Sequence, residues 1–243
     1  MERRDRFRNR ILSRLSAADG AVLSQLQAVD LPLGKVLREP GGEDKLIFFV
    51  EEGMTSATAL SRQGASIEVG VIGREGVVGI GSILGHRGMP HHTVMQVSGN
   101  GYSLPTELFR TEFVKHGTVM QAVHDFIYSQ LAQAAQTALC NRLHATGPRL
   151  ARWLLATSDI VESNSLDLTQ EFLAQMIGAE RSSATIAAGI LKRAGMIDYH
   201  RGHVEIVNRP MLEDAACECY GMLREEFARI FSKMTGQCGR THR

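Results

Sequence analysis

The stretch 168-LTQEFLAQMIGAERSSATIAAGILKRAGMIDYHRGHVEIV-207 decides the fold of this chain. Its first half predicts two short helices joined by a tight turn. Thr169 suits the N-cap of the first helix, and Gly178 suits the left-handed residue that ends it. The second helix opens at Arg181 and stops before Gly195. Ala174 lies one turn before Gly178, which allows the two helices to cross closely.

The second helix has two faces of different chemistry. Ala184, Ala187 and Leu191 recur at helical spacing and form its inward stripe. The outward face near its N-terminus then carries Arg181, Ser182, Ser183 and Thr185. This is the layout of a helix-turn-helix, whose second helix offers its first residues to base edges in the major groove of DNA.

A β-hairpin, the wing of a winged helix, is predicted directly behind these helices. Met196–His200 and His203–Val207 are rich in strand-forming residues and flank Arg201-Gly202. Between Arg181 and Arg209 there are five Lys/Arg against two Asp/Glu, so the segment is locally basic. An ordinary helical pair followed by a hairpin is the alternative interpretation. The predicted DNA contacts are Thr169, Gln170, Arg181, Ser182, Ser183, Thr185 and Arg201.

Composition limits the other classes of protein. With 243 residues and 44% hydrophobic residues, the chain can bury a core in one or two domains. A net charge of +1 excludes a bulk electrostatic binder of nucleic acid, so any DNA contact must be local. No apolar run approaches a membrane span, and the N-terminus lacks the apolar core of a signal peptide. We therefore expect a cytoplasmic protein without a membrane partner.

The cysteines predict neither a disulfide framework nor a metal site. The chain has four, and a cytosolic protein keeps its thiols reduced. Cys217-x-Cys219 is too close for the usual C-x-x-C metal knuckle, and no second pair exists. We expect inert or mildly redox-sensitive thiols, no metal and no cofactor, with a metal or iron–sulfur site as the less favoured alternative. No nucleophile with a base and no pair of carboxylates stands out, so an enzyme is not expected.

The N-terminal half predicts one or two amphipathic helices over residues 10–27, followed by an antiparallel barrel or sandwich. The candidate strands are Val29–Leu33, Val36–Arg38, Leu46–Glu51, Thr55–Leu60, Ser66–Val71, Val77–Ile80, His92–Val97 and Gly101–Pro105. Turns are expected between them at Pro40-Gly41-Gly42, Glu52-Gly53, Gln63-Gly64, Gly73 and Gly99-Asn100-Gly101.

A short helix over Thr106–Lys115 and a long one from Thr118 to about Ala145 come next. One stripe of the long helix keeps three-and-four spacing through Met120, Ile127, Leu131, Ala134 and Ala138. We interpret this stripe as the seam of a parallel homodimeric coiled coil. Packing of one flank against the chain's own barrel is the alternative, and the two are compatible. Gln130, Gln133 and Gln136 are expected to face solvent.

Thr146-Gly147-Pro148 breaks the long helix and is the predicted hinge and domain boundary. Arg149–Ala156 should then pack Leu150, Trp153 and Leu154 beneath the helix-turn-helix. After Pro210, Met211–Met234 is predicted as one last amphipathic helix. The expected organisation is a sensor over 1–116, a dimerisation helix over 117–145, a DNA-binding domain over 146–210 and a tail over 211–243.

In this order, a strand-rich domain, a long dimer helix, a hinge and a winged helix resemble the Crp–Fnr family of bacterial transcription regulators. Asn141-Arg142-Leu143, Arg149–Leu155 and Leu168–Gly178 with Arg181 carry the resemblance most closely. It implies an α+β fold in which a β-roll of the cyclic-nucleotide-binding type precedes the helix and the DNA domain. It also implies that Arg181, Ser182 and Ser183 contact bases. Ile186 stands where the family often has a second Arg, and Glu180 replaces the usual small N-cap.

The sensor departs from the family's cyclic-nucleotide binders. Gly79-Ile80-Gly81 and His91-His92 occupy the places of the Gly-Glu-Leu segment and of the Arg-Ser pair. Ile80 cannot accept a bond from a ribose hydroxyl, and a neutral His is a poor substitute for an Arg fork on phosphate. We therefore expect no tight binding of cyclic AMP. No cysteine precedes Cys140, so the family's N-terminal iron–sulfur sensor is absent.

Gly79, Ile80, Gly81, His91 and His92 thus mark an effector pocket whose ligand is unknown. His86, His91 and His92 leave open a haem or metal site, with solvated histidines at the barrel mouth as the favoured alternative.

The sequence as a whole predicts a homodimeric regulator that reads a pseudo-palindromic promoter site. Its partners would be double-stranded DNA, a second copy of the chain, RNA polymerase and an effector. The alternative function is a small-molecule-binding or protein-interaction module without DNA binding.

Overall fold

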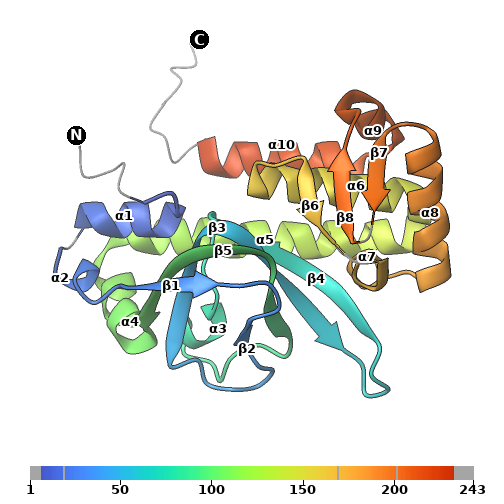
Figure 1. Cartoon of the computed structure of the whole chain (residues 1–243). Helices are drawn as coiled ribbons and strands as arrows, with labels where there is room; N and C mark the ends of the chain where they lie inside the picture. Colours follow the sequence, from blue (N-terminus) through green and yellow to red (C-terminus); the bar gives the residue numbers. More distant parts are fainter. Residues whose placement is uncertain (1–6, 19, 169, 201, 233–243) are drawn as a thin grey trace, which may run out of the picture.

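The computed structural model describes residues 7–18, 20–168, 170–200 and 202–232. An antiparallel β-roll lies beneath one long helix, and a helical domain with a small sheet lies on the other side of that helix (Figure 1). This is the predicted α+β arrangement of β-roll, long helix and winged helix-turn-helix. No helix within the described ranges is both long and apolar enough to cross a membrane.

Two short helices open the described chain, α1 (Arg10–Ala18) and α2 (Gly20–Leu23). The Asn9 side chain caps α1, since its Oδ1 accepts from the backbone N–H groups of Ile11 and Leu12, both at 3.1 Å. Its amide also donates to the backbone oxygens of Val50 and Gly76, which ties α1 to the roll. The predicted opening helices are therefore confirmed.

The roll is a five-stranded antiparallel sheet with the order β1-β5-β3-β4, in which β2 also pairs with β5. Its strands are β1 (Gln27–Leu31), β2 (Val36–Arg38), β3 (Leu46–Leu60), β4 (Ser66–Ile72) and β5 (His92–Pro105). The predicted antiparallel class and most strand positions are confirmed.

The turns predicted at Glu52-Gly53 and at Gly99-Asn100-Gly101 are wrong. Each lies inside a long strand, β3 or β5, where the register shifts and Glu52 faces Asn100. Gly53 has φ +87°, and a Cβ there would lie 2.5 Å from the Val97 oxygen. Glycine is thus required for close backbone approach at a β-bulge that bends both strands over the core, not for a chain reversal.

The strand predicted over Val77–Ile80 is also wrong in its extent. It is reduced to an isolated bridge between Phe48 and Val78. Ile80 already begins the helix α3 (Ile80–Ile83).

The helix α4 (Thr106–Lys115) leads into α5 (Gly117–Leu143), which covers the roll. Val119, Val123 and Phe126 are fully buried in the roll's main core. The ring of Phe126 approaches Gly76 so closely that a Cβ there would lie 2.1 Å from it. One flank of α5 therefore packs on the chain's own roll. This packing was predicted from the sequence as an alternative that is compatible with a dimer seam.

Solvent-facing positions for Gln130 and Gln133 are contradicted. The Gln133 side chain accepts from the Val71 N–H at 2.7 Å, and the Gln130 side chain donates to the Val71 oxygen at 3.1 Å. Val71 lies on β4, at the edge of the sheet, where backbone groups have no strand partner. The two amides thus supply the hydrogen bonds that a further strand would make.

The C-terminal domain begins with α6 (Thr146–Val161) and β6 (Ser165–Asp167), a short strand not predicted. α7 (Gln170–Met176) and α8 (Arg181–Arg193) follow, then the hairpin β7 (Ile197–His200) and β8 (His203–Ile206). β6 joins the hairpin in a three-stranded sheet with the order β6-β8-β7. Leu150, Trp153 and Leu154 of α6 are buried beneath the helix pair, as predicted.

The single tail helix predicted over Met211–Met234 is wrong. It is two helices, α9 (Arg209–Ala215) and α10 (Cys219–Ser232), separated by extended backbone at Ala216 with ψ 153°. The Cys217 N–H donates to the Pro148 oxygen at the start of α6, so the chain turns there and returns along α5 and α6. Residues 235–243, where fraying was expected, lie outside the described residues.

Replacing Gly178 by Ala tests the turn between α7 and α8. Gly178 has φ +57°, and a Cβ there would lie 2.6 Å from the Ile67 Cδ1 atom of β4. A left-handed non-glycine residue costs about 1–2 kcal/mol, so we expect the free energy of unfolding to fall by at least about that amount. Urea unfolding followed by fluorescence of Trp153, the single tryptophan, measures it.

Gly195→Ala is the matched control. Gly195 has φ +72° but no atom within 4 Å of an added Cβ. It therefore reports backbone strain alone, and the excess loss in Gly178→Ala reports the contact with Ile67. An unchanged urea midpoint in Gly178→Ala would contradict the assigned turn.

Candidate DNA interface and sensor sites

The helix-turn-helix is held by small residues at its crossing point. Ala174, Ala184 and Ala187 are buried where α7 meets α8. The Ala179 N–H donates to the Ala174 oxygen at 2.9 Å, which closes the turn. The Arg149 guanidinium donates to the Gly178 oxygen at 2.9 Å, so α6 also fixes this turn.

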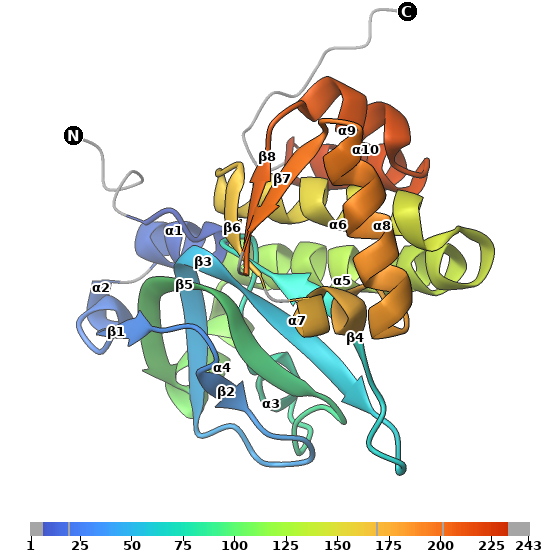
Figure 2. The ribbon, with the colours of Figure 1, turned by 45° about the vertical axis from the view of Figure 1, so that its right-hand side comes forward.

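The N-terminal turns of α8 present the predicted contact residues to solvent. Arg181, Ser182 and Thr185 are exposed, and Ser183 is half-buried. Thr185 Oγ1 donates to the Arg181 oxygen at 2.9 Å, one helical turn away. Figure 2 shows α8 running along the outside of the domain. The structure therefore brings these four residues together on one outward surface, as predicted.

The same face of α8 continues into two apolar residues. Ile186 is 64% exposed and Ile190 is 51% exposed. Glu180, the N-cap residue, makes no side-chain capping bond and is exposed beside Arg181.

The wing is attached to α8 by Lys192. Its ammonium group donates to the Tyr199 oxygen at 3.0 Å and pairs with the Asp198 carboxylate at 2.8 Å. The hydrogen bond from Lys192 lowers the pKa of Asp198. These contacts link the wing to the C-terminal part of α8. Thr169 and Arg201 lie outside the described residues, and the Gln170 side chain is not described.

The residues of the predicted effector pocket lie around one loop of the roll. Gly79 and Gly81 flank the start of α3, and a Cβ on Gly81 would lie 2.9 Å from the Gly88 backbone. The Arg38 guanidinium donates to the backbone oxygens of Met89 at 2.6 Å and His91 at 3.0 Å. Ile80 and His91 are half-buried. His92 begins β5, and its Nδ1 pairs with Glu39 at 3.0 Å.

A buried ion pair engages Arg38, whose guanidinium contacts this loop. Arg38 Nε donates to Asp44 Oδ2 at 3.0 Å, and the two side chains are only 2% and 9% exposed. Ser82 of α3 also donates to the same carboxylate oxygen at 2.9 Å. Burial lowers the pKa of His91, and the nearby Arg38 charge acts in the same direction. The loop thus offers a neutral imidazole and an arginine already neutralised by a carboxylate.

The predicted dimer stripe on α5 is divided between the roll and solvent. Ile127 is half-buried against the roll, whereas Met120 is 38% and Leu131 is 65% exposed. Ala134 and Ala138 are exposed too. Leu139 and Leu143 extend the exposed apolar surface to the end of the helix.

A buried carboxyl group joins the roll to the DNA domain. Glu68 of β4 accepts from the Trp153 indole N–H of α6 at 2.8 Å and from the Ser56 hydroxyl at 2.8 Å. The Gln175 side chain of α7 donates to the Ser66 hydroxyl of β4 at 2.7 Å. Burial raises the pKa of Glu68 to about 7, against the opposing hydrogen bonds and the charge of Arg152.

Three cysteines and a histidine come together at a place where their spacing in the sequence did not predict a metal site. Cys140 and His144 at the end of α5 meet Cys217 and Cys219 at the break between α9 and α10. Only the separation of four residues between Cys140 and His144, one helical turn, could have been read as a ligand pair in the sequence. The other two ligands come from a break in a segment predicted as continuous helix.

Comparison with known proteins agrees with this geometry. Residues 148–215 match the model of the Crp-like helix-turn-helix domain. A transcriptional regulator of the Crp/Fnr family from Eubacterium rectale has a similar structure, with a TM-score of 0.65 and 16% identity, covering 83% of this chain and 96% of that chain. A Crp/Fnr regulator from Thermus thermophilus gives 0.63 and 20%, covering 78% and 98%.

A further solved structure, the c-di-GMP responsive global regulator of Xanthomonas campestris, gives a TM-score of 0.64 at 16% identity, covering 81% of this chain and 97% of that chain. Among curated proteins, no sequence matches. This chain has the fold of the Crp–Fnr transcriptional regulators and carries a Crp-like helix-turn-helix domain. The resemblance predicted from the sequence is confirmed at that level.

The Glu68 carboxyl group predicts a pH-dependent stability. Its pKa is about 7 in the fold against an ordinary 4.5, so its favourable contribution is complete below pH 4.5 and is lost as the pH rises through 7. The difference between the two pKa values corresponds to about 3 kcal/mol in the free energy of unfolding. Glu68→Gln should therefore gain stability relative to the wild type as the pH rises from about 4.5 to 8.

Urea unfolding at each pH, followed by Trp153 fluorescence, measures the difference. Glu107→Gln is the control, because Glu107 is an exposed carboxylate on α4, paired with Arg110. A Glu68→Gln curve parallel to that of the wild type would show that Glu68 does not titrate in this range.

Proposed function

We propose that this chain is a homodimeric, sequence-specific DNA-binding transcription regulator. The observation that carries the proposal is the outward surface formed by Arg181, Ser182 and Thr185 at the start of α8, within a Crp-like helix-turn-helix. Helix N-termini favour the approach of phosphates, and exposed first-turn side chains reach base edges. RNA polymerase would be a further partner at the promoter.

Within this surface the residue types divide the tasks. Arg181 suits a bidentate pair with guanine, and Ser182 and Ser183 suit either bases or phosphate. Thr185 lies on the same face. Thr169, Gln170 and Arg201 are proposed to contact the phosphate backbone of the DNA. Ile186, 64% exposed where an Arg is frequent in the family, suits the methyl group of thymine. The expected half-site therefore combines a guanine with a neighbouring A·T pair.

The proposed dimer seam is the exposed part of the α5 stripe. Leu131 is 65% exposed, and Ala134 and Ala138 follow at three- and four-residue intervals with small side chains. A second copy of α5 could therefore approach closely and cover this stripe. Two-fold symmetry would then present two α8 helices to half-sites about one helical turn of DNA apart.

An effector other than cyclic AMP is proposed for the sensor. Arg38 is neutralised by Asp44, and burial keeps His91 neutral, so neither of these two side chains offers a free cation for a cyclic phosphate. The similar Xanthomonas protein is described as responsive to c-di-GMP, so this fold accommodates different signals. A cavity of about 420 Å³ between β4, α6 and α10 is a second place where a small molecule could reach the domain junction.

Arg181→Ala tests base readout. A lost bidentate contact should cost about 1–3 kcal/mol and relax specificity at one base pair in each half-site. The operator is first selected from random DNA with the purified protein, and binding is then measured on sites carrying each substitution. Ile186→Ala should relax a different, A·T position. An equal loss on all sequences would make Arg181 a phosphate contact instead.

Leu131→Glu tests the seam. Two buried leucines per dimer would be lost and two carboxylates brought together, which should weaken the dimer by at least about 3 kcal/mol. Sedimentation equilibrium measures the dissociation constant. Leu33→Glu is the matched control, because Leu33 is 58% exposed in the loop between β1 and β2. A dimer equally stable in both variants would place the interface elsewhere.

A further inference from the structure

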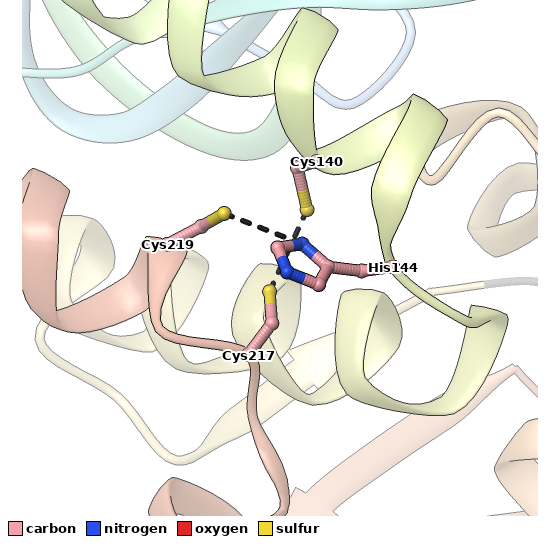
Figure 3. A group of neighbouring side chains, drawn as sticks. All are labelled: Cys140, His144, Cys217 and Cys219. Carbon is pink, nitrogen blue, oxygen red and sulfur yellow. Dashed lines mark hydrogen bonds between the residues drawn. The ribbon is translucent and has the colours of Figure 1, made fainter.

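The end of α5 and the break between α9 and α10 bring together a compact group of soft ligands. The Cys140, Cys217 and Cys219 sulfurs and one His144 ring nitrogen all lie within 4.8 Å of one another (Figure 3). Cys140 and Cys219 are fully buried, and Cys217 is 7% exposed. Each side chain points toward a common centre, although the ligands come from positions 73 or more residues apart across the two segments.

The separations match tetrahedral coordination of a zinc ion. Zn–S bonds of about 2.3 Å and Zn–N bonds of about 2.0 Å at tetrahedral angles place sulfurs about 3.8 Å apart and a sulfur about 3.5 Å from a nitrogen. Here the Cys140 and Cys217 sulfurs are 3.5 Å apart, and the Cys219 sulfur is 3.5 Å from His144 Nδ1. We propose that Cys140, His144, Cys217 and Cys219 bind a Zn²⁺ ion.

The surrounding groups fit the same interpretation. His144 Nε2 lies 3.0 Å from the Glu218 carboxylate, which would orient Nδ1 toward the metal. The Gln136 amide donates to the Cys219 sulfur at 3.0 Å. At metal sites, hydrogen bonds of these two kinds orient the residues that bind the metal directly. Both side chains therefore act as positioning residues.

Buried cations lie beside the cluster. Three thiolates and Zn²⁺ carry a net charge of −1, which is costly to bury without a cation. Arg149 and Arg152 are 7% and 6% exposed, and their charges act on Cys140. The Nε atoms of both arginines have no hydrogen-bond partner among the described residues. Two buried guanidinium groups beside the cluster thus supply the compensating charge.

Other uses of the cluster explain less of it. A disulfide between Cys140 and Cys217 would leave Cys219, His144 and the Glu218 contact without a role. An iron–sulfur cluster lies between its ligands and spreads them more widely than a single ion does, whereas these ligand atoms are all within 4.8 Å. Thiolate and imidazole ligands in a closed tetrahedral set favour Zn²⁺.

The metal would connect the end of the dimer helix to the tail across the start of α6. Cys140 and His144 precede Thr146, where α6 begins, and the Cys217 N–H already contacts Pro148 of that first turn. Zinc binding would therefore hold the angle between α5 and the DNA domain. Metal binding itself does not depend on the proposed function, so its test uses no DNA.

The test uses the full-length chain, reduced and freed of metal by a chelator, then titrated with Zn²⁺ against a chromophoric competitor. We expect about one tightly bound ion per chain. Replacement by Co²⁺ should give the intense visible bands and the thiolate charge-transfer band of a tetrahedral site. Hydrogen exchange in residues 217–232 should slow on adding Zn²⁺ but not Mg²⁺.

Matched variants identify the ligands. His144→Gln and Cys219→Ser should each weaken Zn²⁺ binding by at least about 100-fold, and Glu218→Gln by about tenfold. Cys238→Ser removes the one cysteine outside the described residues and should leave binding unchanged. His144→Gln removes no thiol, so it keeps the test valid should a cysteine variant fail to fold.

Several results would overturn the proposal. These are a reduced chain that takes up no zinc, equal affinity in the wild type and in His144→Gln, or octahedral Co²⁺ without charge transfer. An iron–sulfur chromophore in the anaerobically purified chain would do the same. DNA binding that fails while zinc binds as expected would contradict the proposed function alone.

Discussion

The contact between α6 and the roll is the constraint on which the rest of the structure depends. Met54 and Val71 of the sheet share one core with Leu150, Trp153 and Leu154 of α6. Beside the roll's own main core, the roll and the DNA domain therefore share a core at their junction, and a flexible linker is not all that joins them. A shift of the sheet by a fraction of an ångström must move α6, because close-packed interiors transmit strain instead of absorbing it.

Within that shared core, polar groups give the contact a defined register. The Trp153 indole bonds to Glu68, the Gln175 amide bonds to Ser66, and Arg149 holds the turn at Gly178. An apolar interface alone would allow sliding, whereas buried hydrogen bonds favour one arrangement. The first helix of the helix-turn-helix is thereby fixed to β4, and α8 remains free on the outside. This explains how one face of the DNA domain can be rigidly placed while the other stays exposed.

The DNA-binding half was largely predictable from the sequence because its signals are local. The alanine stripe, Gly178 and the hairpin around Gly202 each act within a few residues, and the observed α8, β7 and β8 agree closely with the predicted ranges. The roll was predicted in class but not in detail. Gly53 and Gly99 are compatible with either a turn or a bulge, and only the pairing of β3 with β5 decides between them.

The contacts that side chains make around α5 were the least predictable part of the structure. Gln130 and Gln133 look like surface residues in the sequence, yet they complete the hydrogen bonding of an edge strand that lies far away along the chain. Cys217-x-Cys219 has no ligand spacing of its own, and its partners come from another helix. The periodicity of the sequence cannot predict such sites, because they form only through tertiary contacts.

These features meet within a short part of the chain. The exposed stripe ends at Leu143, the proposed zinc ligands include Cys140 and His144, and α6 enters the shared core at Leu150. Between them lies the break at Ala145, with extended backbone of φ −67° and ψ 158°. In a dimer joined along α5, the rotation at this break would set the separation of the two α8 helices. Since half-sites on DNA lie at a fixed spacing, a few degrees there would suffice to align or misalign both recognition helices. A signal that alters the roll, the cysteine–histidine cluster or the seam would therefore act by changing the rotation at this break.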